Sequence, residues 1–228
     1  MISKIHQRKY FTPALLALAF LVTAVPALAN PPAPAEKTIS IAEARALPLG
    51  TVVTIDGSVT VPSGAFSSST FDQGFAIQDR TGGIYVSTSD NLGFAPRQQV
   101  RVTGTLADTL LPGLLVLVDV SDVKAHGSGP KVAAQPVATG GVGEATEGSI
   151  VRITGTITQP IVNDLPFGFI IVVNDGSGEV NVFVAASTGI DVSGLSQGQT
   201  IEVTGFSGQF ADHFEVDPRF QTDIKVVP

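Results

Sequence analysis

The pattern of hydrophobic and polar positions changes near Gly50. Before it, Ser40-Ile41-Ala42-Glu43 fits a capping box, in which the serine hydroxyl and the Glu43 carboxylate satisfy free amides at a helix start. Pro48 and Gly50 close the segment, which predicts a short helix ending at about Leu47. After Gly50, apolar and polar residues alternate with a period of two and β-branched residues dominate, which predicts strands.

The same series of elements occurs twice, about 100 residues apart. The matching segments are 50–57 with 148–155, 74–79 with 168–175, and 99–104 with 199–205. Because the offset stays nearly constant over the whole series, we interpret the chain as two domains of one kind rather than as a short-period repeat.

Each repeat predicts five strands: a first strand, a long loop, a hairpin of two strands, an irregular segment, a fourth strand and a final strand. The final strand is expected at 113–123 in the first unit and at about 213–226 in the second. Glycines lie where the first and fourth strands must bend, as a small closed barrel requires. The predicted fold class is therefore all-β, with two tandem five-stranded barrels and a short helix before the first.

Linker-like composition sets the domain boundaries. We predict a signal peptide at 1–29, a Pro/Ala-rich tether at 30–38, a first barrel at 39–124, a Gly/Pro-rich linker at 125–141 and a second barrel at 142–228.

The first 29 residues have the layout of a signal peptide. Lys4, Arg8 and Lys9 precede an uncharged apolar stretch from Pro13 to Val25, and Ala27-Leu28-Ala29 supplies small residues for cleavage before Asn30. The alternative is a membrane anchor, but about 13 apolar residues fall short of the roughly 20 that a spanning helix needs. The sequence therefore predicts export to the periplasm or the medium, with no stable membrane insertion after cleavage.

Composition excludes several kinds of chemistry. The chain has no cysteine, which excludes disulfides, thiolate metal sites and a cysteine nucleophile. Its formal charge is −7, and removal of residues 1–29, which hold three basic and no acidic residues, makes it −10. A chain this acidic does not bind polyanions by general electrostatic attraction.

The pattern resembles the OB-fold domains of exported bacterial proteins, which often accompany extracellular nuclease domains. The likeness is carried by Ser40–Ala46 leading to Gly50–Gly57, by Gly74–Asp79 and Gly82–Val86, and by Val100–Gly104, with a weaker version from Val142 to Gly205. The resemblance implies Greek-key barrels of OB type. It also implies ligand binding on the face of the second and third strands, between the loops after strands one and four.

Aromatic residues and a few cations fall in that implied region. The predicted ligand-binding residues are Phe66, Phe71, Arg80, Tyr85 and Arg97 in the first unit, and Phe167, Phe206, Phe210 and Arg219 in the second. Rings beside cations suit stacking on single-stranded bases. The alternative for any strand phenylalanine is the core, which we expect for Phe75 and Phe169. For Phe66, Phe71, Phe206 and Phe210, which we expect in Ser/Gly-containing loops, binding and packing stay equally open.

The carboxylates point to structural roles. Asp79 and Asp175 each precede a glycine-containing turn, where an aspartate bonds its own backbone two residues on. His213, Glu215 and Asp217 would share one strand face, and we expect a solvated polar face there rather than a metal site. We predict no metal, no cofactor and no catalytic residue, since no nucleophile-elbow or phosphate-loop motif occurs.

Two functions remain open from the sequence. The first is a non-enzymatic exported protein that binds single-stranded nucleic acid through barrel-face and loop aromatics. The second is an interaction module for a protein or a glycan. The fold and the loop aromatics favour the first, whereas basic residues spread without a cluster count against it. We place the first ahead, because a local basic patch can coexist with an acidic remainder.

Overall fold

The computed structural model describes residues 37–109, 111 and 113–227, all within one compact unit. The predicted signal peptide and the tether up to residue 36 lie outside the described residues. Helix α1 (Ile41–Arg45) begins at Ser40, whose hydroxyl accepts a hydrogen bond from the Glu43 amide while the Glu43 carboxylate accepts one from the Ser40 amide. The predicted capping box is confirmed, and the helix ends two residues before the predicted Leu47.

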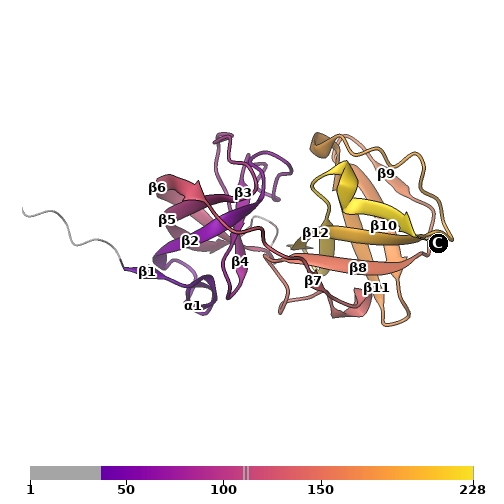
Figure 1. Cartoon of the computed structure of the whole chain (residues 1–228), viewed down its shortest axis with the longest axis horizontal. Coiled ribbons are helices and arrows are strands. Elements are labelled where there is room, and N and C mark those ends of the chain that lie inside the picture. The colour runs from indigo at the N-terminus through magenta and orange to yellow at the C-terminus, as the bar shows by residue number, and fades with distance from the viewer. Residues whose placement is uncertain (1–36, 110, 112, 228) are drawn as a thin grey trace, which may run out of the picture. The chain divides into compact units, whose positions relative to one another are not determined.

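The first barrel closes around five strands (Figure 1). They are β2 (Val52–Val61), β3 (Phe75–Gln78), β4 (Gly83–Val86), β5 (Gln98–Asp108) and β6 (Leu115–Ser128). They pair in the order β2-β3-β4-β6-β5, and β5 pairs back with β2. Only the β4–β6 pair in this ring is parallel. A two-residue strand, β1 (Thr38–Ile39), runs parallel to β2 before the helix.

The second barrel repeats this ring. Its strands are β8 (Ile150–Ile157), β10 (Gly168–Asn174), β11 (Glu179–Ala185), β12 (Thr200–Phe210) and β13 (His213–Asp217), with short β7 (Gln135–Pro136), β9 (Val162–Asp164) and β14 (Ile224–Val227) alongside. They pair in the order β8-β10-β11-β13-β12, with β12 pairing back to β8, and β11–β13 is the parallel pair. The prediction of two tandem five-stranded barrels is confirmed.

The final strands differ between the two barrels. Strand β6 runs on to Ser128, into the range predicted as linker. The single strand predicted at 213–226 is wrong, because β13 ends at Asp217 and β14 begins at Ile224 after a 3-10 turn, η3 (Gln221–Asp223). Pro218 has no amide to donate to a ladder, which explains the break. The domain boundaries themselves stay a prediction.

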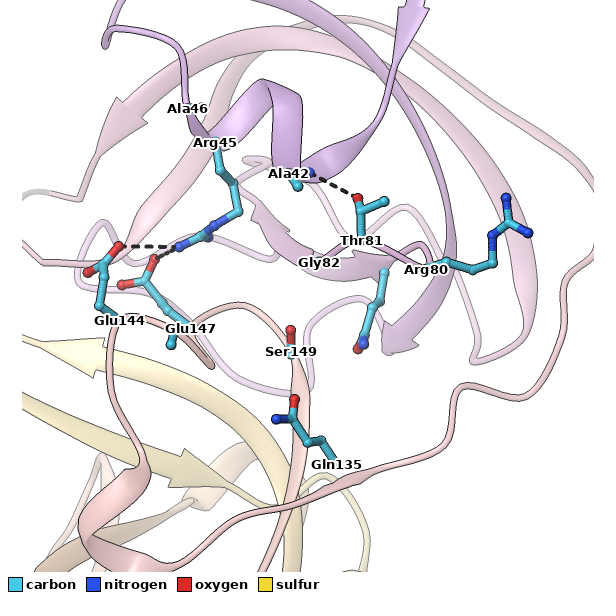
Figure 2. Close-up of a pocket in the computed structure, with 12 residues that line it drawn as sticks. Ala42, Arg45, Ala46, Arg80, Thr81, Gly82, Gln135, Glu144, Glu147 and Ser149 are labelled. Atoms are coloured by element: carbon cyan, nitrogen blue, oxygen red, sulfur yellow. Dashed lines mark hydrogen bonds and ion pairs between the residues drawn. The ribbon is translucent and has the colours of Figure 1, made fainter.

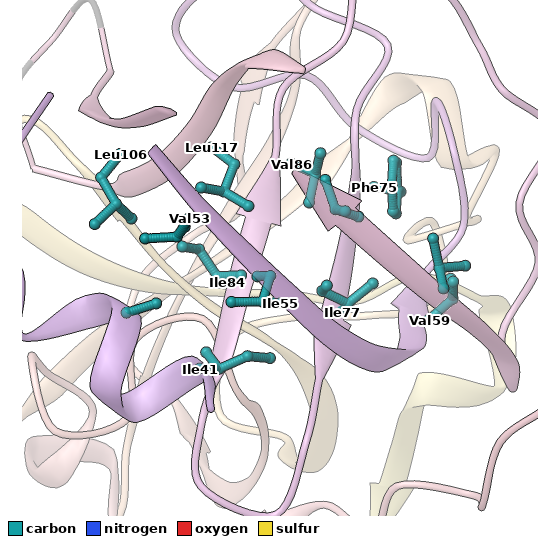
Figure 3. Close-up of a cluster of buried hydrophobic side chains, with 13 residues drawn as sticks. Ile41, Val53, Ile55, Val59, Phe75, Ile77, Ile84, Val86, Leu106 and Leu117 are labelled. Atoms are coloured by element: carbon teal, nitrogen blue, oxygen red, sulfur yellow. The ribbon is translucent and has the colours of Figure 1, made fainter. Parts of the chain in front are cut away.

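Each barrel encloses its own apolar core. Figure 3 shows the first core, in which Ile41 of α1 closes one end and Val53, Ile55, Ile77, Ile84, Val86 and Leu117 point inward from the strands. The second core holds the corresponding inward residues, among them Val151, Ile153, Ile171, Val173, Val182 and Val203. Phe75 belongs to the first core and Phe169 packs against the second, as expected.

Two further 3-10 turns lie at the start and at the middle of the second barrel, η1 (Thr139–Gly141) and η2 (Ala186–Thr188). No helix in the described part of the chain has the length and apolar character needed to span a membrane.

Candidate functional site

The outer face of β3 and β4 is the surface on which OB-type barrels hold ligands. Strand register places Val61, Ala76, Tyr85 and Val116 in one row across β2, β3, β4 and β6. All four are fully buried, although they point away from the first core. The loops at either end of the row add Phe66 and Leu114, which are also buried.

The second barrel covers this row. Its Ile150, Ala185 and Phe206 form one buried cluster with the row and with Phe66 and Leu114, and we call these nine residues the contact face. The Phe206 ring lies 5.7 Å from the Phe66 ring and 6.2 Å from the Tyr85 ring, centroid to centroid. The second barrel therefore covers the face of the first barrel that corresponds to the usual ligand-binding face of OB-type barrels.

Three of the predicted ligand-binding rings belong to this contact face. Phe206 was expected in a loop, but it lies within β12 and is fully buried. Tyr85 is also fully buried, and Phe66 keeps 8% of its surface. Of the two possibilities left open for Phe66 and Phe206, the structure shows packing, and the Tyr85 ring, predicted to bind ligand, packs against both of them.

The loop between β2 and β3 is organised around Asp72. Its carboxylate accepts hydrogen bonds from the Ser68 amide, from the hydroxyls of Ser68, Thr70 and Ser87, and from the Tyr85 hydroxyl at 2.8 Å. Burial alone would raise the pKa of Asp72, but the hydrogen bonds from Ser87 and Ser68 outweigh it and lower the pKa below its ordinary value. Burial and the Asp72 charge raise the pKa of Tyr85.

This loop holds Phe71 out into solvent. Phe71 has a φ of 59°, in the left-handed region that costs a non-glycine residue energy, and its side chain is 74% exposed. The hydrogen bonds to the neighbouring Asp72 offset that cost. Of the two possibilities left open for Phe71, packing in the core does not occur, and the ring is exposed on a backbone held by hydrogen bonds.

Phe167 and Phe210 are the other predicted rings that stay exposed, at 56% and 43%. Phe210 was expected in a loop but ends β12, and Phe167 precedes β10. Leu111, 43% exposed, lies in the loop between β5 and β6. We call Phe71, Leu111, Phe167 and Phe210 the apolar rim.

Contacts between loops bring the apolar rim to the edge of the contact face. The Leu111 amide donates to the Ser69 hydroxyl at 3.0 Å, which joins it to the loop of Phe71. Gly113 lies so close to Gln209, next to Phe210, that a Cβ there would be 2.8 Å from its side chain. The Ser187 hydroxyl donates to the Ala65 carbonyl at 2.7 Å, and the adjacent Ala186 amide donates to the Phe167 carbonyl at 2.8 Å.

The three predicted arginines do not join these rings. Arg80 lies in the turn after β3, at the end of the β3–β4 hairpin opposite to the Phe71 loop. The backbone amide of Arg97 donates to Val59 and its carbonyl accepts from Gly129, on the β5 side of β2. The Arg219 guanidinium donates to the Asp223 carboxylate and, at 2.8 Å, to the Thr60 carbonyl. The predicted combination of rings and cations on one face is not assembled.

A polar pocket of about 430 Å³ lies beside α1 (Figure 2). Arg45 of α1 donates to Glu147 at 2.8 Å, and Glu147 also accepts from the Leu115 amide at 3.3 Å, so this carboxylate ties the second barrel to the first. Burial raises the pKa of Glu147 although the Arg45 guanidinium opposes it, and its buried Oε2 atom has no hydrogen-bond partner among the described residues. We interpret the buried Arg45–Glu147 ion pair as a contact that joins the two barrels.

The pocket mouth offers hydrogen-bond donors. Arg80, Gln135 and Ser149 line it and make no side-chain hydrogen bond or ion pair within the described residues. Such a set suits a small polar molecule, but it lacks the apolar walls that most small-molecule sites have.

Asp79 and Asp175 have the predicted turn role. Asp79 accepts from the Thr81 and Gly82 amides, and Asp175 accepts from the Ser177 amide. Each also reaches back to the segment that precedes its barrel, since Asp79 accepts from the Ile41 amide and Asp175 from the Thr139 amide. This second contact was not predicted from the sequence, although the matching aspartates of the two repeats could have suggested it.

As predicted, alternate positions on one face of β13 carry His213, Glu215 and Asp217. They pair with Phe210, Gly208 and Phe206 of β12, respectively. The expectation of a solvated polar face is wrong for Asp217, which is only 6% exposed beside the contact face. No group of three or more histidines and carboxylates in the described ranges is placed to hold a metal ion.

The ring closure and strand order define tandem barrels of OB type. No family model matches the chain, and no curated protein matches it. Among solved structures, the chain is similar to the hypothetical protein ygiW from E. coli, with 18% identity and a TM-score of 0.32, over 41% of this chain and 94% of that one.

Two longer likenesses cover both barrels. A murine DNA binding protein bound with double-stranded DNA shows 13% identity and a TM-score of 0.40, over 76% of this chain and 98% of that one. Fission yeast Pot1 with single-stranded DNA shows 10% identity and a TM-score of 0.34, over 80% of this chain and 85% of that one.

Proposed function

We propose that this chain is an exported, non-enzymatic binding protein that holds its ligand at the apolar rim. The observation that carries the proposal is the contrast between two sets of rings. Phe66, Tyr85 and Phe206 are sealed in the contact face, whereas Phe71 and its neighbours on the apolar rim stay exposed around its edge. Apolar groups that are exposed together in one patch often mark an interaction site, whereas single exposed apolar residues are ordinary.

The fixed backbone of Phe71 supports a binding role. A ring presented on an ordered loop loses little conformational entropy when a partner covers it, which makes aromatic side chains efficient anchors. The strained backbone of Phe71 persists because the hydrogen bonds of the buried Asp72 carboxylate hold the loop in place. Folding alone gives no reason to hold a ring in solvent in this way.

Charge favours a neutral or cationic ligand. The loops of the apolar rim, residues 62–74, 109–114, 158–167 and 207–214, contain no lysine or arginine, and they contain Asp72, Asp164 and Asp212. Phosphate groups would meet no cation there. We therefore place a protein or glycan ligand first.

Single-stranded nucleic acid is the second candidate. Exposed rings on the loops of OB-type barrels can stack on bases, and each stack contributes about 1–3 kcal/mol. Without cations in those loops, such binding would be weak and would depend little on salt.

The proposal of a non-enzymatic role rests on the surroundings of the two histidines that follow residue 29, His126 and His213. His126 contacts the Asp56 carboxylate at 2.8 Å, and His213 lies near Asp212 and Glu215. Within the described residues no serine or threonine hydroxyl bonds to either ring, so no base-activated nucleophile is formed. Export rests on the layout of residues 1–29.

The test is a binding screen on purified protein with glycan arrays, unfolded polypeptides and short single-stranded DNA and RNA. Phe71→Ala, Phe167→Ala and Phe210→Ala should each weaken binding of the ligand found, by about 1–3 kcal/mol. Leu49→Ala is the matched control, because Leu49 is 59% exposed before β2 and away from the apolar rim. Equal loss from the control, or no loss from the three variants, would remove the rim as the site.

A further inference from the structure

Glu215 and Asp217 occupy successive outward positions on β13. Register pairs Asp217 with Phe206 and Glu215 with Gly208. Phe206 is the residue of the second barrel whose ring packs on Phe66 and Tyr85. The two carboxyl groups therefore border the contact face directly.

Within the described residues, no hydrogen-bond donor or cation compensates the Asp217 carboxyl. The residue is 6% exposed, and its Oδ1 atom is buried without a hydrogen bond. A Cβ at position 208 would lie 2.9 Å from Asp217 Oδ2 and 3.5 Å from the Phe206 ring, so the carboxyl fits between a glycine and that ring. An isolated carboxylate in such surroundings takes up a proton rather than stay ionised.

Within the described residues no lysine or arginine pairs with Glu215 or Asp217. The nearest basic group on β13 is His213, whose Nε2 atom lies 3.8 Å from Glu215 Oε2 and is a cation only when the ring is protonated. On the same face of β12, Glu202 is engaged by Lys225 and Arg152, and Glu179 on β11 accepts from Thr158. From the first barrel, Tyr85 faces this region and is bonded to Asp72, while Arg219, which follows β13, is bonded to Asp223.

Burial raises the pKa of Glu215 to about 7, and burial together with the Glu215 charge raises the pKa of Asp217 well above its ordinary value. In the unfolded chain both groups ionise near pH 4. Above that pH the folded state binds more protons than the unfolded state, so this contribution to stability falls as pH rises through neutrality. Below about pH 4 both carboxyl groups are protonated in the folded and in the unfolded state, so they no longer make the stability depend on pH.

We propose that the Glu215–Asp217 pair makes the contact between the two barrels pH-dependent. In mildly acidic solution the pair is protonated and the contact face is closed. As pH rises through neutrality the pair gains negative charge beside Phe206, first at Glu215, and the contact face loosens. This pH dependence requires no ligand, so its test is independent of the binding proposed for the apolar rim.

Tyr85 provides a local reporter. The chain has two tyrosines, Tyr10 and Tyr85, and no tryptophan. In the full chain carrying Tyr10→Phe, tyrosine emission therefore comes from the contact face alone. We expect acrylamide quenching of this emission to increase about twofold or more between about pH 5.5 and about pH 8.5, as the face opens more often. The melting temperature should fall by about 4 °C or more over the same range.

The variant Asp217→Asn with Glu215→Gln should flatten both pH profiles. Glu215→Gln alone, at the more exposed position, serves if the double variant does not fold, and it should reduce both slopes. Asp90→Asn is the control, because Asp90 is an exposed carboxylate in the loop after β4 and does not belong to the contact face. It should leave the quenching profile unchanged.

Two results would overturn the proposal. One is a wild-type quenching profile that is flat or reversed between these pH values. The other is a pH slope of quenching that survives Glu215→Gln undiminished. The carboxylates with lowered pKa, Asp72 and Asp79 among them, ionise below this range and do not affect the comparison.

Discussion

Gly57 in β2 and Gly155 in β8 lie where the first strand of each barrel passes close to its neighbour. A Cβ would lie 3.2 Å from backbone atoms of Gln78 at the first position and 2.8 Å from the Asn174 carbonyl carbon at the second. Neither glycine has a positive φ, so space rather than backbone angle requires glycine.

Gly155→Val should lower the free energy of unfolding by about 1–3 kcal/mol, because the added side chain must push the β10 backbone away. Gly57→Val should act in the same direction with a smaller effect, since its contact is longer. Denaturant unfolding measures both. Gly194→Ala is the control, because nothing lies within 4 Å of its Cβ position; an equal loss in the control would show that close approach is not the cause.

The loop between β2 and β3 depends on a single carboxylate. Asp72→Ala removes the acceptor for Ser68, Thr70, Ser87 and Tyr85, and should destabilise the protein by about 1–3 kcal/mol, because buried donors lose their partner. Amide exchange in residues 66–72 should become faster, while exchange in β10 of the second barrel stays unchanged. Unchanged exchange in the loop would contradict this account.

The same loop should respond to acid. The pKa of Asp72 is lower in the folded state, so its contribution is fully present above the ordinary value near pH 4 and is lost as pH falls through the folded pKa. Amide exchange in residues 66–72, corrected for the intrinsic rate, should therefore increase below about pH 4. Asp72→Asn should remove that acid response, and a response that persists in this variant would assign it to another group.

Across the whole molecule, Phe206 and Phe210 form a matched pair on the same face of β12. Phe206→Ala leaves a cavity beside the stacked Phe66 and Tyr85 rings and should cost about 3–5 kcal/mol in unfolding free energy. Phe210→Ala, 43% exposed at the rim, should change stability by about 0.5 kcal/mol or less. Calorimetry of both variants tests the contact face, since equal effects would mean that Phe206 does not join the barrels.

Strands β3 and β4 show which buried positions could be predicted from the sequence. The alternation that predicted strands assigned Phe75 and Ile77 correctly to the core, because inward positions follow from the period of a strand. The same period places Tyr85 outward, on the face where ligand binding was predicted. Yet Phe75-Ala76-Ile77 and Ile84-Tyr85-Val86 are apolar on both faces, a signal of burial on both sides that was available in the sequence.

The sequence by itself determined the capping box, the two repeats, the closed five-stranded barrels and the aspartate turns. Each of these depends on neighbours along the chain or on hydrophobic periodicity, and such local preferences are written residue by residue. Only the tertiary structure decided that Phe66, Tyr85 and Phe206 are buried, that the predicted arginines lie apart from the exposed rings, and that Asp217 has no partner. These properties depend on which surface of one barrel packs on the other, between residues more than 100 positions apart in the sequence, as in the contact of Tyr85 with Phe206.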